Sequence, residues 1–192
     1  KQYEQNKDEK YPHLTAVQWK RLRTLVERIA DVFYIDGAEP TAVKDYEFEV
    51  ELREGVKPFQ ARAPKLSPEQ QRKERLHLNK SLKMGHLITP EVKDLGQWTA
   101  PVHVVYKKGD SDGRLIVDFR ALNHATVAQP ISLQDVRDKV RRLASFRWKA
   151  VFDAVHGFNQ IKASPAAQKV LQIQTSMGIK QYTVLPFGVV NG

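Results

Sequence analysis

The hydrophobic positions early in the chain change from helical spacing to strand spacing. Apolar side chains recur every three or four residues over 22–33, and Thr15 with Gln18 forms a capping box ahead of them. This pattern predicts a helix that ends before Gly37. Over residues 46–52, apolar side chains alternate with glutamates. That alternation predicts a strand with one buried face.

A second helix and a β-hairpin are predicted in the middle of the chain. Residues 67–70 combine a capping box with a proline at the first helical position, and Gly85 suits the C-terminal end of the helix. Strand-like segments at 102–106 and 115–119 then flank a polar tip that contains glycine. Such a tip between two apolar runs is typical of a hairpin.

The last third of the chain contains one more helical pattern and three short apolar runs. The helical pattern covers residues 133–143, and Val136 and Val140 are expected to face inward. An apolar run over 148–152 predicts a strand that leads into Asp153. The two remaining runs, at 170–175 and 181–185, predict a final pair of strands.

Composition narrows the function classes. The 192 residues include no cysteine, which excludes disulfides and thiolate metal sites, and the six histidines lack the spacing of zinc ligands. No apolar run reaches membrane-spanning length, so no membrane partner is expected. The net charge of +9 favours a polyanionic partner, although a basic surface also keeps a protein in solution.

Two places carry candidate chemistry. Asp153 follows an apolar run, where a carboxylate can hold a hard cation such as Mg²⁺, although aspartates in this position also cap turns. Phe158, five residues on, is placed to press on a sugar. Three of the eight residues over 107–114 are cationic and could grip a triphosphate, although a solvated hairpin end has the same composition.

Seven landmarks in order make the chain resemble the reverse transcriptases of gypsy-type LTR retrotransposons, from about residue 46 onward. They include Val117-Asp118-Phe119-Arg120-Ala121-Leu122-Asn123, the Asp153 segment with Gly157-Phe158-Asn159-Gln160-Ile161, and Leu185-Pro186-Phe187-Gly188. The other four lie at residues 53–58, 66–69, 85–88 and 98–102.

The resemblance implies a role for each matching residue. Asp153 would bind the two metal ions of a polymerase site, helped by the carbonyl of Ala154, with Mg²⁺ as cofactor and Mn²⁺ as an alternative. Phe158 would be the aromatic gate that excludes a 2′-hydroxyl. Three cationic residues match positions that bind the dNTP triphosphate or the template: Lys107 and Arg114 for the triphosphate, and Arg120 for the template. Asp118 is expected to be structural.

The resemblance also implies an α+β fold, the polymerase right hand, with the fingers and part of the palm. The expected organisation is an N-terminal arm and helix (1–45), fingers (46–128), a palm segment with the first catalytic aspartate (129–160) and a second fingers segment (161–192). The Tyr-x-Asp-Asp turn of the family is absent from these residues, and His156 and Asn159 depart from the usual pattern.

Three functional hypotheses follow. The first is a fragment of an RNA-directed DNA polymerase that works on an RNA or DNA template–primer and dNTPs, and that does not polymerise alone. The second is a non-catalytic, retroelement-derived subunit or binding module, whose incomplete palm other protein subunits would cover. The third is non-specific nucleic-acid binding. An intracellular location is expected, in the cytoplasm or nucleus, or in a virus-like particle.

Overall fold

The computed structural model describes residues 12–34, 41–106, 113–130 and 135–192. The chain divides into two compact units, residues 1–38 and 39–192. Residues 107–112 of the predicted hairpin tip, Lys107 among them, and the predicted start of the third helix lie outside the described residues. In the described part, no helix is long and apolar enough to cross a membrane.

The first unit contains the helix α2 (Ala16–Arg28) and a short 3₁₀ turn, η1 (Ala30–Val32). The predicted capping box is present: Gln18 N donates to Thr15 Oγ1, and Thr15 N donates to Gln18 Oε1. The α-helix ends at Arg28, earlier than the apolar spacing predicts, because the chain continues as 3₁₀ turn rather than α-helix.

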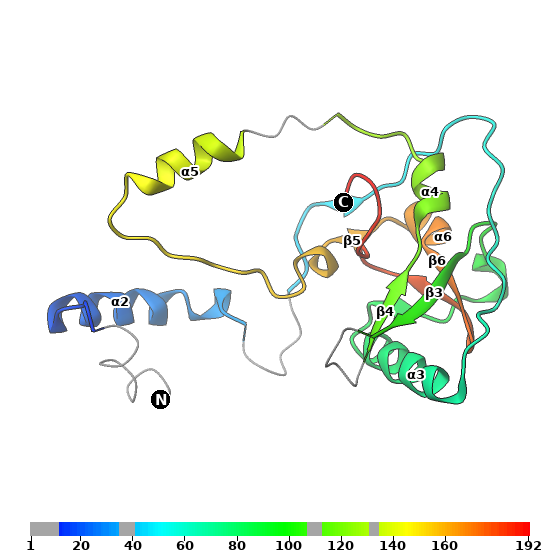
Figure 1. The fold of residues 1–192 in the computed structure, drawn as a ribbon, viewed down its shortest axis with the longest axis horizontal. Helices are drawn as coiled ribbons and strands as arrows, with labels where there is room; N and C mark the ends of the chain where they lie inside the picture. The colour runs from blue at the N-terminus through cyan, green and yellow to red at the C-terminus, as the bar shows by residue number, and fades with distance from the viewer. Residues whose placement is uncertain (1–11, 35–40, 107–112, 131–134) are drawn as a thin grey trace. The chain divides into compact units, whose positions relative to one another are not determined.

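The second unit is built on a mixed five-stranded sheet with the strand order β2-β7-β6-β3-β4. Its strands are β2 (Leu87–Ile88), β3 (Ala100–Val105), β4 (Arg114–Val117), β6 (Gln172–Thr175) and β7 (Gly178–Tyr182). Both predicted strand pairs are present as antiparallel hairpins, β3–β4 and β6–β7, but β7 begins at Gly178 instead of the predicted residue 181. A parallel pairing of β3 with β6 joins them, so distant parts of the chain share one sheet (Figure 1).

A second, two-stranded sheet replaces the long strand predicted over 46–52. β1 (Glu47–Phe48) pairs in parallel with β5 (Lys162–Ala163), and Leu52 makes only an isolated bridge to Thr126. The predicted burial is correct for Phe48, which is buried, and for the half-buried Val50 and Leu52. Tyr46 is exposed, because the ladder begins after it.

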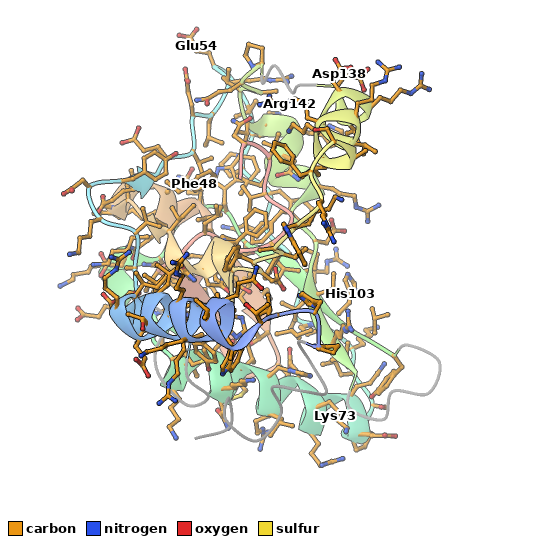
Figure 2. The ribbon with its side chains drawn as sticks, turned by 90° about the vertical axis from the view of Figure 1, so that its left-hand side faces the viewer. Phe48, Glu54, Lys73, His103, Asp138 and Arg142 are labelled. Carbon is orange, nitrogen blue, oxygen red and sulfur yellow. The ribbon has the colours of Figure 1, made fainter. Side chains whose placement is uncertain are left out.

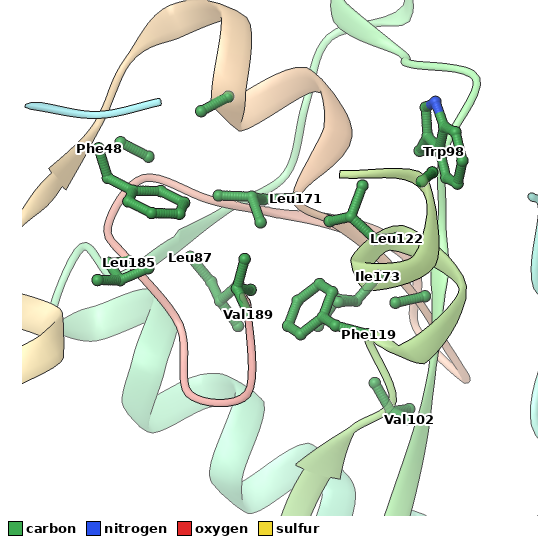
Figure 3. Packing of buried hydrophobic residues seen from close by; sticks show 14 of the residues in the cluster. Phe48, Leu87, Trp98, Val102, Phe119, Leu122, Leu171, Ile173, Leu185 and Val189 are labelled. Carbon is green, nitrogen blue, oxygen red and sulfur yellow. The ribbon is translucent and has the colours of Figure 1, made fainter. Parts of the chain in front are cut away.

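Helices pack beside the main sheet around one hydrophobic core. α3 (Pro68–Lys83) contacts β2, β3 and β4 (Figure 1), and the short helices α4 (Arg120–Ala125) and α6 (Pro165–Val170) follow β4 and β5 along the chain. Figure 3 shows side chains from α4 and the strands meeting in this core. Among its members are Phe119, Leu122, Leu171, Ile173 and Leu185.

The helix α3 has the predicted caps, and it buries both charged and apolar side chains. Ser67 caps it, and Gly85, with φ of +70°, follows its C-cap. Leu78 is fully buried, whereas Leu76 is 56% exposed. Glu74 and Lys73 are buried as well; Lys73 is labelled on α3 in Figure 2.

The segment around Asp153 differs most from the sequence-based prediction. The helix α5 (Val136–Ala144) begins at the cap Asp135, and Asp138 and Arg142 are labelled on it in Figure 2. Val136 and Val140, predicted to face inward, are 70% and 57% exposed. Residues 148–152 form no strand, because no segment of the described chain pairs with them.

Candidate functional site

One groove in the second unit is lined by cationic and histidine side chains. It has a volume of about 650 Å³ and lies between α3, the strand β4 and the loops before β5 and after β7. The cationic residues Lys80 and Arg114 and three histidines contribute to its wall, together with Asn159 and the turn at residues 186–188. The histidines are His77, His86 and His156. A groove of this charge suits an anionic ligand.

Phe158 is placed by a short 3₁₀ helix, η3 (Gly157–Gln160), next to this groove. The turn begins at His156, whose left-handed backbone (φ 50°, ψ 39°) redirects the chain. The Gln160 side chain donates from Nε2 to the carbonyl of Val155 at 2.8 Å, which closes the turn. Phe158 remains 40% exposed, and its ring packs against that of Phe187, with the centroids 4.9 Å apart.

The turn that carries Phe187 is held by asparagine side chains from both sides. Asn159 Nδ2 donates to the carbonyl of Leu185 at 3.1 Å. From α4, Asn123 Nδ2 donates to the carbonyl of Gly188 at 2.8 Å, and Asn123 Oδ1 accepts from Val190 N at 2.9 Å. The turn is therefore tied both to η3 and to α4.

A third asparagine closes the loop after the turn. Asn191 Nδ2 donates to the carbonyl of Val127 at 2.8 Å, while Asn191 Oδ1 accepts from Gln129 N at 2.9 Å. Asn191 has a left-handed backbone with φ of 69°, a conformation that asparagine tolerates better than most residues. Hydrogen bonds from asparagine side chains thus join residues 123–129 to residues 188–191.

Asp153 and Ala154 lie in an exposed segment before η3, outside helix or strand. A carboxylate and a backbone carbonyl are oxygen donors of the kind that Mg²⁺ prefers, and exposure leaves them accessible. In the described residues, however, no three His, Asp or Glu side chains gather into a group that could hold a metal ion. These two residues supply only part of a metal site.

Arg114 is the predicted triphosphate ligand that the structure places in the groove. It begins the strand β4, pairs with Val105 in the register of the hairpin, and is exposed. Asp153 and Phe158 are not among the residues that line the groove, although Phe158 reaches it through its contact with Phe187. Lys107 is outside the described residues, so its place beside Arg114 stays a prediction.

Arg120 is the first residue of α4 and forms a salt bridge with Asp118. Its Nη2 donates to Asp118 Oδ2 at 2.6 Å and its Nε to Oδ1 at 2.9 Å, while its backbone N–H also donates to Oδ1. These side-chain and backbone hydrogen bonds lower the pKa of Asp118 to about 2. The Arg120 side chain stays 83% exposed. The structural role predicted for Asp118 thus gains a physical basis.

Sequence reasoning missed the role of two residues inside its own landmarks. Asn123 and Phe187 both belong to matched motifs, but neither was given a function. One motif, residues 117–123, ends in Asn123, and the other, residues 185–188, contains an aromatic residue followed by glycine. An asparagine and a turn of this kind are the sequence features that could have indicated a contact. Only the fold shows that these motifs touch, because they lie far apart in the chain.

Comparison with curated proteins finds relatives among retroelement and viral polyproteins. The chain is 25% identical over 184 residues to the retrovirus-related Pol polyprotein from transposon 412 of Drosophila melanogaster. This match covers 93% of the chain and 14% of that protein. It is 28% identical over 167 residues to the Gag-Pol polyprotein of gibbon ape leukemia virus, covering 81% of the chain and 8% of the relative. The chain therefore spans a small part of these relatives. No protein-family model matches it.

Comparison with solved structures identifies the fold. The foamy viral protease–reverse transcriptase in complex with RNA/DNA hybrid matches with a TM-score of 0.73 at 17% identity, over 93% of this chain and 23% of that one. The same viral enzyme in complex with double-stranded DNA matches with a TM-score of 0.67 at 19% identity, over 93% of this chain and 34% of that one. The predicted α+β fold, with the fingers and part of the palm of a reverse transcriptase, is confirmed. The sequence resemblance is confirmed at the level of retroviral and retrotransposon Pol polyproteins.

Proposed function

We propose that this chain is part of an RNA-directed DNA polymerase of a gypsy-type LTR retroelement, and that the groove beside Phe187 receives the incoming deoxynucleotide. The observation that carries the proposal is the meeting of Arg114, Phe187 and the Phe158 turn around one basic groove. The likeness to the transposon 412 polyprotein supports the same class of element.

In this proposal the chain's own residues bind and orient the nucleotide. The Arg114 guanidinium and the Lys107 ammonium are proposed to hold the triphosphate, because such groups pair with phosphate oxygens. The exposed ring of Phe158 lies under the sugar and leaves no room for a 2′-hydroxyl. Arg120 contacts the template strand, held in its pose by Asp118. Holding both reactants in place accounts for much of the rate enhancement in such a transfer.

The metal site in this proposal begins at Asp153. Its carboxylate, with the Ala154 carbonyl, would hold Mg²⁺, and Mn²⁺ would serve as a substitute. When bound, the ions stabilise charge on the attacking 3′-oxygen and on the leaving pyrophosphate. One carboxylate is too few for a two-metal site. A complete site would need further ligands besides Asp153 and Ala154.

The domain assignment is part of the proposal. Residues 46–128 and 161–192 would form the fingers, 129–160 the palm segment, and 1–45 an N-terminal arm and helix. The sheet supports the pairing of the two fingers segments, since β5 pairs with β1 and β6 pairs with β3. The proposed setting is intracellular, with an RNA or DNA template–primer as partner.

Template-dependent primer extension tests the proposal. A polymerase that contains these residues should extend a primer with Mg²⁺ and dNTPs, and Asp153→Asn should abolish extension, whereas the matched control Asp138→Asn on α5 should not. The 192-residue chain alone should not extend at all. Extension that survives Asp153→Asn would show that the site is assigned to the wrong residue.

A second candidate function is a non-catalytic subunit or binding module of a larger assembly. The exposed apolar side chains beside Asp153 favour it, since Val151 is 94% and Phe152 is 79% exposed. Such side chains suit a covering protein surface. If the native protein lacks extension activity but co-purifies with a stoichiometric partner that protects residues 146–152 from proteolysis, this second function would replace the first.

A further inference from the structure

Asn123 connects two motifs that the sequence keeps far apart. Its amide uses both ends on the same turn: Nδ2 donates to the carbonyl of Gly188, and Oδ1 accepts from the backbone N–H of Val190. Gly188 has φ of +89°, a conformation that residues with a β-carbon rarely adopt. The turn therefore depends on partners outside itself to keep one shape.

The same turn forms part of the wall of the basic groove. Pro186, Phe187 and Gly188 all line it, and the Phe187 ring meets the ring of Phe158. Phe187 is 60% exposed, so less than half of its surface is held by the rest of the protein. A shift of Gly188 would move Phe187, and with it the surface that supports Phe158.

Asn123 itself is firmly placed. It lies on α4 between the buried Leu122 and Ala125, and its backbone N–H donates to the carbonyl of Phe119 at 2.7 Å. Phe119 and Leu122 belong to the hydrophobic core. The core therefore holds the Asn123 amide in place, and the amide in turn holds the exposed turn.

We propose that Asn123 is a positioning residue: it fixes the turn of Phe187 and Gly188 and thereby the pose of the Phe158 ring that discriminates between sugars. The expected effect of Asn123 on nucleotide selection rests on the proposed function. The positioning itself is a property of this chain and is measured without nucleotide. A primary amide is required, because a hydroxyl or a carboxylate cannot both donate to Gly188 and accept from Val190 with the same reach.

The test is NMR on the 192-residue chain with labelled phenylalanine. In the wild-type chain, a cross-ring NOE between Phe158 and Phe187 and slow amide exchange at Val190 are expected. Asn123→Ala should abolish the NOE and speed Val190 exchange about tenfold, the effect of losing one hydrogen bond. Asn123→Asp, which keeps an acceptor but repels the Gly188 carbonyl, should lose the NOE while Val190 stays protected.

A matched control separates positioning from general destabilisation. Thr126→Val removes the hydrogen bond from Thr126 Oγ1 to the carbonyl of Leu122 at the end of the same helix and does not touch the turn. It should lower the melting temperature yet leave the ring NOE intact. The proposal is overturned if Asn123→Ala keeps the NOE, or if Thr126→Val loses it equally.

Titration of the same samples with dATP and ATP measures the consequence. The wild-type chain should favour dATP, and Asn123→Ala should lose that preference while Thr126→Val retains it. A wild-type chain without any preference would count against the proposed nucleotide site, whereas the NOE would still decide the role of Asn123. Preference retained in Asn123→Ala would refute its effect on selection.

Discussion

The rings of Phe158 and Phe187 meet at 4.9 Å between centroids, with their planes inclined by 58°. Tilted contacts at this separation are favourable for aromatic pairs. The two residues come from the short turn after Asp153 and from the turn after β7, and both turns are fixed by asparagine amides. The contact joins two of the sequence motifs that carry the resemblance to reverse transcriptases.

The first prediction concerns this aromatic pair. In a polymerase containing these residues, Phe158→Ala should relax sugar discrimination, lowering the ratio of kcat/KM for dNTP over NTP by about tenfold or more, because the ring no longer blocks a 2′-hydroxyl. Phe146→Ala, which removes a ring that is 61% exposed, is the control and should leave the ratio unchanged. Unchanged discrimination in Phe158→Ala would remove the steric-gate assignment.

A second prediction concerns the buried carboxylate on α3. Glu74 is fully buried and accepts hydrogen bonds from the backbone N–H and the hydroxyl of Ser176, at the tip of the β6–β7 hairpin. Glu74→Ala should lower the free energy of unfolding by about 1–3 kcal/mol, since the hydrogen bonds between the buried carboxylate and Ser176 are lost.

Urea denaturation measures this loss, and Glu74→Gln, which keeps an acceptor oxygen, should show a smaller one. Glu69→Ala, at an exposed position in the first turn of the same helix, should cost about 0.3–1 kcal/mol through the helix dipole. Equal losses at positions 74 and 69 would show that the link from α3 to the hairpin contributes little.

The parts of the fold that sequence reasoning predicted are those set by local signals. The capping boxes at Thr15 and Ser67 need only residues within one helical turn, and both are present. The two hairpins join neighbouring apolar runs, so short connections define them. The strand expected over 46–52 fails in most of its length, because its partner β5 lies far along the chain and pairs with only two residues.

The site was predictable only where single residues suffice. Arg114 lies in the basic groove, while its contact with a triphosphate stays a prediction. The strand expected before Asp153 is absent because apolar character alone does not supply a pairing partner. The hydrogen bond from Asn123 to Gly188 and the one from Ser176 to the buried Glu74 could not be predicted, since each joins segments distant in sequence.

A third prediction concerns the core between the sheet and its helices. Leu171, at the end of α6, is fully buried, so Leu171→Ala should lower the free energy of unfolding by about 2–5 kcal/mol through lost burial and a cavity. Leu76→Ala on α3 removes the same atoms from a side chain that is 56% exposed and should cost far less. Thermal and urea unfolding would compare the two. A similar cost at both positions would contradict the assignment of the core.

A fourth prediction concerns the pH dependence of the Asp118–Arg120 pair. The folded-state pKa of Asp118, about 2, lies below its usual value of 3.8. A depressed carboxyl pKa stabilises the fold above pH 3.8, and that contribution disappears as the pH falls toward 2. Arg120→Gln should return the pKa of Asp118 toward 3.8, as followed by carboxyl NMR titration. Arg75→Gln, which removes a charge elsewhere, should not. A wild-type Asp118 that titrates near 3.8 would mean that the ion pair does not form in solution.

The last prediction concerns nucleic-acid binding by the chain itself. With a net charge of +9, the chain should bind an RNA/DNA hybrid with an affinity that falls steeply as salt rises, because bound cations are released from the phosphates. If Arg120 contacts a phosphate of the template, Arg120→Gln should reduce the slope of log affinity against log salt by about one, equally for different sequences. Arg53→Gln, an exposed charge on the loop after β1, serves as the control and should leave the slope unchanged. Fluorescence anisotropy at several salt concentrations measures the slopes of both variants.

A flat salt response in the wild-type chain would exclude phosphate contacts as the source of binding. An unchanged slope in Arg120→Gln would show that Arg120 does not contact the template.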